Sequence, residues 1–126
     1  MKLLPLALSG NAGFSFLSGL LLATLPKYIA GIFAASTYIP FVLIGLGLLF
    51  FAYTIWIEIK AQRPNKILAI IVQDLLWVVA SLVILLTRPL SISDIGYSII
   101  AWIGGIVLLF AILQAWGWWK KPKLES

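Results

Sequence analysis

The sequence predicts an all-α integral membrane protein: a four-transmembrane-helix bundle with both termini cytoplasmic and a short interfacial helix after the first span. Hydrophobic residues make up 63% of the 126 residues and charged residues only 10%, and the mean hydropathy is +1.11. Soluble proteins average about 25% charged residues, and a soluble domain of this length could not bury so much apolar surface. The second observation is four apolar stretches of about 20 residues, enough to cross a hydrocarbon core of about 30 Å.

The chain is expected to form one transmembrane domain. The predicted spans are residues 6–25, 40–59, 67–87 and 95–116, and residues 117–126 form a polar cytoplasmic tail. The start of the chain resembles a signal peptide, but the apolar run Leu3–Leu8 is shorter than the roughly 7–15 residues of such a core. We therefore expect an uncleaved first span.

Proline residues set the ends of the first two spans. Pro26 ends the first, because the residue before a proline is disfavoured in the helical region. Apolar residues then recur at helical spacing from Tyr28 to Phe33, which is typical of a short helix lying in the membrane interface. Pro40 suits the first turn of the second span, where a missing N–H costs nothing.

The last connection has its own signals. Arg88 and Pro89 close the third span. Ser91 or Ser93 is expected to cap the fourth helix, and Asp94 is favourable in the first turn of that helix.

The basic residues predict the orientation of the four spans. An even number of spans places both termini on one side, and seven of the nine basic residues fall on that side. These are Lys2, Lys60, Arg63, Lys66, Lys120, Lys121 and Lys123, against Lys27 and Arg88 on the other side. Short cytoplasmic loops carry an excess of Lys and Arg, so both termini should be cytoplasmic.

Several kinds of chemistry are excluded by composition. The chain has no cysteine and no histidine, which removes disulfides, thiol nucleophiles, bis-histidine haem, the usual zinc sites and a histidine base. We expect no enzyme, no catalytic residue, no metal site and no cofactor. The net charge of +5 follows from the orientation and from anionic lipid headgroups, so no nucleic-acid partner is expected.

Asp74 is the main candidate for a functional residue. It lies seven residues into the third span, roughly 10 Å deep, with no basic residue at matching depth. A central aspartate costs about 2.5–3.5 kcal/mol on the insertion scale, whereas one interhelical hydrogen bond returns less than about 2 kcal/mol. Burial favours the neutral acid, which could donate to Asn11 or Gln114 as a structural lock or as a proton-binding site.

Other polar side chains lie in the same half of the predicted bundle. Asn11, Ser15 and Ser18 share one helical stripe, and Asn11 could meet Asp74 directly because the first and third spans are parallel. The predicted buried polar cluster comprises Asp74, Asn11, Gln114, Glu58, Gln73, Ser15, Ser18 and Ser81, with Trp77 either in a pocket wall or packed on a neighbouring helix. An alternative for Glu58 is a solvated charge paired with Lys60 or Arg63.

Two motifs carry a family resemblance. They are Asn11-Ala12-x-x-Ser15-x-x-Ser18-Gly19 followed by Pro26, and Asp74-x-x-Trp77-Val78 together with Gln114. The chain resembles a recurrent type of short bacterial four-helix inner-membrane protein, which implies a bacterial inner (plasma) membrane location and no assigned activity. Small multidrug transporters are similar in length, but they carry their essential carboxylate in the first span, where this chain has Asn11.

Two classes of function remain open. The first is a non-enzymatic accessory subunit that binds lipid or a membrane-protein partner, with the polar cluster fixing helix register. The second is a small proton-coupled transporter or channel, a homo-oligomer in which Asp74 binds the proton. A transporter predicts a cavity that reaches Asp74, and an accessory protein predicts a dry, packed polar layer.

Overall fold

The computed structural model describes residues 3–88 and 92–120, and these residues form five helices and no strand. The helices are α1 (Leu3–Thr24), α2 (Pro26–Ile32), α3 (Ile39–Ala61), α4 (Pro64–Thr87) and α5 (Asp94–Lys120). Four of them, all except α2, are long and apolar enough to cross a membrane. The predicted all-helical class with four membrane-length helices is therefore confirmed.

The long helices extend beyond the predicted apolar spans. α5 continues to Lys120, four residues past the predicted end, and α4 begins at Pro64 rather than at Ile67. Pro64 occupies the first turn of α4, where proline is well tolerated. The prediction followed hydrophobicity, whereas backbone hydrogen bonding continues into the flanking polar residues.

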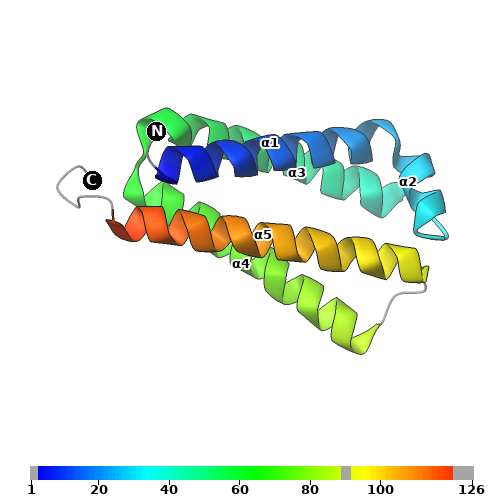
Figure 1. Ribbon diagram of the computed structural model, residues 1–126. Coiled ribbons are helices and arrows are strands. Elements are labelled where there is room, and N and C mark those ends of the chain that lie inside the picture. The colour runs from blue at the N-terminus through cyan, green and yellow to red at the C-terminus, as the bar shows by residue number, and fades with distance from the viewer. Residues whose placement is uncertain (1–2, 89–91, 121–126) are drawn as a thin grey trace.

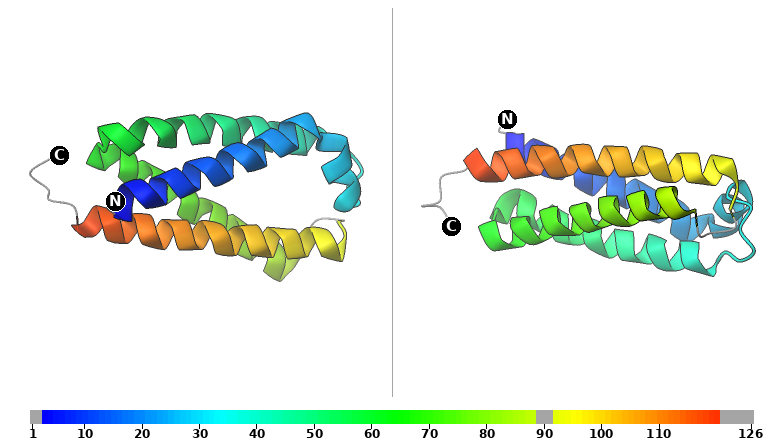
Figure 2. Two further views of the ribbon diagram at one scale, coloured as in Figure 1. Left: turned by 45° about the horizontal axis from the view of Figure 1, so that its top comes forward. Right: turned by 90° about the horizontal axis from the view of Figure 1, so that it is seen from below.

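The four long helices form two pairs (Figure 1). α3 packs along α1 and α4 packs along α5, and α1 also packs on α5, whereas α3 and α4 touch little. In Figure 1, α4 leans away from α3 toward the end of the bundle that carries α2. We call that end distal, and we call the end where α1 begins and α5 ends proximal, as both views of Figure 2 show.

The hydrophobic core lies in the proximal half. Its buried side chains come from α1, α3 and α4 and include Leu4, Leu8, Ile55, Ile67, Ile70 and Ile71. The indole N–H of Trp118 donates to the carbonyl oxygen of Pro64 at 3.1 Å, which ties the end of α5 to the start of α4. The opposite faces of the helices expose large apolar side chains, such as Phe50 at 71% and Leu86 at 76%, as expected for surfaces that face lipid.

Polar contacts join the elements at the distal end. The Ser93 hydroxyl accepts the backbone N–H of Gly96 at 3.0 Å, so Ser93 caps α5 as predicted. The same hydroxyl donates to the carbonyl oxygen of Ile32 at 2.8 Å, and Arg88 pairs with Asp94 at 2.6 Å. Ser91 and Pro89 lie outside the described residues.

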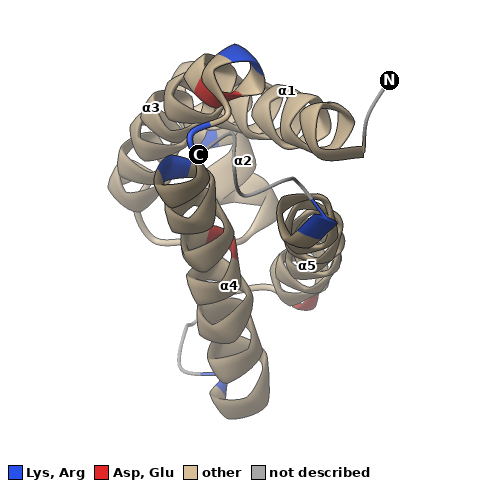
Figure 3. Ribbon diagram, turned by 90° about the vertical axis from the view of Figure 1, so that its left-hand side faces the viewer, with Lys and Arg blue, Asp and Glu red and all other residues tan. Residues whose placement is uncertain are grey.

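Most of the described basic residues lie at the proximal end, which faces the viewer in Figure 3. The proximal residues are Lys60 in the last turn of α3, Arg63 between α3 and α4, Lys66 in the first turn of α4 and Lys120 at the end of α5, whereas Lys27 and Arg88 lie at the distal end. The charge asymmetry seen in the sequence therefore corresponds to the two ends of the bundle.

Candidate functional site

Asp74 lies between three helices in the middle of the bundle. It projects from α4 and is only 1% exposed, and its neighbours are Asn11 on α1 and Gln114 on α5, both fully buried. Asn11 Nδ2 donates to Asp74 Oδ2 at 2.8 Å, and Gln114 Nε2 donates to the same oxygen at 2.7 Å. We refer to Asp74, Asn11 and Gln114 as the polar triad.

The hydrogen bonds of the polar triad form a closed ring. Asn11 Nδ2 also donates to Gln114 Oε1 at 2.9 Å, and the Ser15 hydroxyl donates to Asn11 Oδ1 at 3.3 Å. The sequence suggested that Asp74 would donate to these amides. In the structure Asp74 is the acceptor instead, because each amide group has two N–H donors to place and the carboxylate supplies the acceptor oxygen.

Buried apolar side chains lie on the proximal side of the polar triad. Leu8, one turn before Asn11 on α1, and Ile70 and Ile71, one turn before Asp74 on α4, are all buried in the core. The open side of the polar triad is therefore the distal one.

An apolar cavity of about 590 Å³ begins at the polar triad and extends toward the distal end. Asp74 and Asn11 line its inner end, and residues of all five helices line its walls. Ser15, Ser18, Ser81 and Trp77 also line this cavity, which we call the distal cavity. From the polar triad to Ile84 the distance along α4 is roughly 15 Å.

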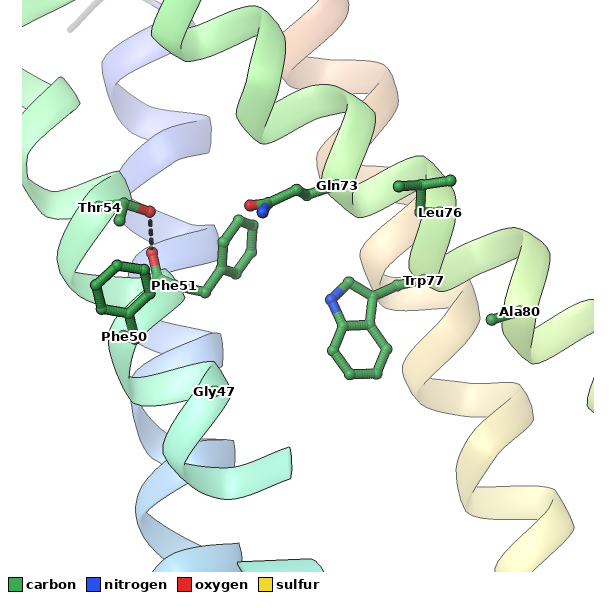
Figure 4. A pocket seen from close by; sticks show the side chains of 8 residues that line it. All are labelled: Gly47, Phe50, Phe51, Thr54, Gln73, Leu76, Trp77 and Ala80. Atoms are coloured by element: carbon green, nitrogen blue, oxygen red, sulfur yellow. Dashed lines mark hydrogen bonds between the residues drawn. The ribbon is translucent and has the colours of Figure 1, made fainter. Parts of the chain in front are cut away.

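A second hollow, of about 390 Å³, lies between α3 and α4 where these helices diverge, and we call it the lateral groove. Figure 4 shows Phe51 of α3 and Trp77 of α4 projecting into the space between the two helices. Phe51, Trp77 and Ala80 line both this lateral groove and the distal cavity. These three side chains therefore lie between the distal cavity and the lateral groove.

Gln73 does not belong to the polar triad, contrary to the grouping made from the sequence. It is exposed and lines the lateral groove, as Figure 4 also shows. Successive residues of an α-helix are turned by about 100°, so Gln73 and the adjacent Asp74 point to different faces of α4.

Glu58 is buried, as expected, but it too lies outside the polar triad. Its carboxylate forms an ion pair with Arg63 and accepts the backbone N–H of Arg63 at 3.0 Å. The side-chain hydrogen bond to Glu58 raises the pKa of Arg63. Glu58 lies one turn before the end of α3. Its carboxylate therefore meets the loop that leads to α4 rather than Asp74. The ion pair with Arg63 agrees with the alternative that the sequence offered for Glu58. The carboxylate is buried, however, rather than solvated as that alternative expected.

The described residues offer no metal site, since nowhere in residues 3–88 and 92–120 do three acidic, histidine or cysteine side chains come together. Comparison of the chain with protein-family models, with curated proteins and with solved structures gives no match. Fold and site together define a helical protein with four membrane-length helices, a buried carboxylate and an apolar cavity open on one side of it.

Proposed function

We propose that this chain is a non-enzymatic membrane protein that binds a lipid-like molecule in the distal cavity. The observation that carries the proposal is the position of Asp74, whose carboxylate lies at the inner end of a largely apolar cavity. Small-molecule sites commonly have volumes of about 300–1,000 Å³, apolar walls and a few polar groups that fix orientation. The distal cavity has all three properties.

The lateral groove supports access from the bilayer. It lies between α3 and α4, and Phe51, Trp77 and Ala80 line both this groove and the distal cavity. An apolar molecule dissolved in the membrane would reach the cavity by rotation of the Trp77 and Phe51 side chains. Such an accessory role requires no contact with the aqueous phase.

Location and orientation are part of the same proposal. We place the chain in a bacterial inner membrane with both termini cytoplasmic, because Lys and Arg are concentrated at the proximal end. The distal cavity then lies in the outer half of the membrane. Gln73, an exposed amide in the lateral groove, supports contact with a second copy or a membrane-protein partner there, since an amide facing lipid gains from a hydrogen-bonding partner.

The experiment that tests the proposal is photolabelling of the lipid-reconstituted protein with an alkyl alcohol that carries a diazirine. Labelling within α1, α3 and α4 that excess decanol suppresses would support a saturable site. The variant Gly104→Leu, at a buried position that lines the distal cavity, should reduce this labelling several-fold. The matched control is Gly105→Leu, where an added side chain meets no neighbour within 4 Å.

A second variant guards against misfolding of Gly104→Leu, because a Cβ at Gly104 would lie 3.3 Å from that of Ser81. Ser18→Phe fills the same cavity from α1 and should also reduce the labelling. Labelling spread evenly over the lipid-facing surface, with no competition by decanol, would contradict the proposal.

A proton-coupled carrier is the second candidate, and one observation favours it. The Asp74 carboxylate borders a cavity, and no basic side chain of the described residues lines that cavity with it. A proton could neutralise the carboxylate. Proton flux into liposomes that depends on the protein and is abolished by Asp74→Asn would support the carrier, whereas flux equal to that of empty liposomes would reject it.

A further inference from the structure

The two oxygens of the Asp74 carboxylate have different surroundings. Oδ2 accepts both amide N–H groups of the polar triad, whereas no group among residues 3–88 and 92–120 donates to Oδ1. Every fully buried side-chain oxygen or nitrogen of these residues has a hydrogen-bond partner. Asp74 lines the distal cavity, so Oδ1, which accepts no hydrogen bond from the described residues, is the acceptor left for a group bound in that cavity.

The cavity also lacks a positive charge to balance this carboxylate. Among the described basic residues, Arg63 pairs with Glu58 and Arg88 pairs with Asp94, and none lines the distal cavity. A buried charge is costly unless it is paired and hydrogen-bonded. A ligand that brings its own positive charge to Oδ1 would supply the missing partner.

From these features we propose that the distal cavity binds an alkylamine-type amphiphile, with its ammonium group at Asp74 Oδ1 and its hydrocarbon chain along the apolar walls. This inference rests on the proposed function and names the chemical class of the ligand. An N–H donor on a cation forms a stronger hydrogen bond with a carboxylate than a neutral donor does, which favours an amine over an alcohol of the same length.

Neighbouring side chains suit an ammonium group. Trp77 lies three residues after Asp74, so the two side chains share one face of α4, and an indole ring attracts a nearby cation. The hydroxyl of Ser15, which lines the distal cavity with Asn11, donates to Asn11 Oδ1 at 3.3 Å. The oxygen lone pairs of Ser15 therefore remain to accept a further N–H group of an ammonium.

The test compares decylamine with decanol by calorimetric titration of the full chain in phosphatidylcholine nanodiscs at pH 7, with empty nanodiscs as the blank. An alkylammonium has a pKa near that of lysine, about 10.4, and is charged at this pH. We expect decylamine to bind at least tenfold more tightly than decanol. Asp74→Asn should remove this preference, while Asp94→Asn, which removes an equal charge from an exposed position outside the cavity, should retain it.

Trp77→Leu provides a variant outside the polar triad. It should weaken decylamine binding by about two- to fivefold and leave decanol binding nearly unchanged. Equal binding of decylamine and decanol to the unmodified chain would overturn the ammonium inference and leave the proposed function standing. Saturable binding of neither compound would overturn both.

Discussion

Gly19 of α1 and Gly45 of α3 lie so close together that a Cβ built on Gly19 would be 2.8 Å from the carbonyl oxygen of Gly45. A Cβ on Gly45 would in turn lie 2.8 Å from the backbone nitrogen of Ala23. Real Cβ atoms do not approach backbone atoms this closely, so any side chain here must push the helices apart. This contact fixes the crossing of α1 over α3, in the way small residues do in membrane helix pairs.

Gly45→Ala should therefore destabilise the protein by about 1–3 kcal/mol, the usual cost of overpacking. The matched control is Gly47→Ala on the same helix, where an added Cβ meets nothing within 4 Å. Reversible unfolding in mixed detergent micelles measures both changes. Equal stability of the two variants would show that the α1–α3 contact is looser than described.

The sequence could predict the four long helices because hydrophobic length and proline positions are local signals. It also indicated Asn11, Asp74 and Gln114, since polar side chains at similar depth in an apolar bundle need one another. It placed Gln73 wrongly, although the turn of about 100° between successive helical residues already separates Gln73 from Asp74. For Glu58 it gave the pair with Arg63 only as an alternative, because a single sequence does not show which neighbours a helix end meets.

The small residues show the same limit. The spacing of Gly47, Thr54 and Glu58 predicts a shared inward face of the second span, yet Gly47 lines the lateral groove, and Gly45 makes the close helix contact instead. Spacing identifies which residues share a face but not which neighbour the face meets. The sequence could not predict the distal cavity either, because the cavity results from packing that is dense at the proximal end of the bundle and open at the distal end.

In the ion pair of Glu58 with Arg63, removing the cation should lower the unfolding midpoint more than removing the negative charge. Glu58 is only 2% exposed, so Arg63→Ala should leave a buried carboxylate without its cation and lower the unfolding midpoint. Glu58→Gln should cost less, since the amide oxygen can still accept the backbone N–H of Arg63. Lys60→Ala, at an exposed position two residues along, is the control and should leave the midpoint unchanged.

The proposed orientation predicts the labelling of single cysteines. The chain contains no cysteine of its own, so each introduced thiol reports alone. Lys66→Cys at the proximal end should react with a membrane-impermeant maleimide only after the cells are opened, and Thr37→Cys at the distal end should react in intact cells. The opposite pattern would reverse the orientation and would place the distal cavity in the cytoplasmic half.

The hydrogen bond between Asn11 and Asp74 predicts energetic coupling between α1 and α4. Asn11→Ala and Asp74→Ala, singly and combined, form a double-mutant cycle that isolates this coupling. Interhelical hydrogen bonds in membrane proteins average about 0.6 kcal/mol, and bonds to a charged group reach about 1.5–3 kcal/mol. We expect a coupling of about 1–3 kcal/mol, because the bond from Asn11 Nδ2 to Asp74 Oδ2 is buried and measures 2.8 Å. The control cycle pairs Asp74 with Ser9, whose hydroxyl bonds within α1 to Pro5, and it should give less than about 0.5 kcal/mol. A similarly small value for Asn11 would mean that the polar triad contributes no specific link between the helices.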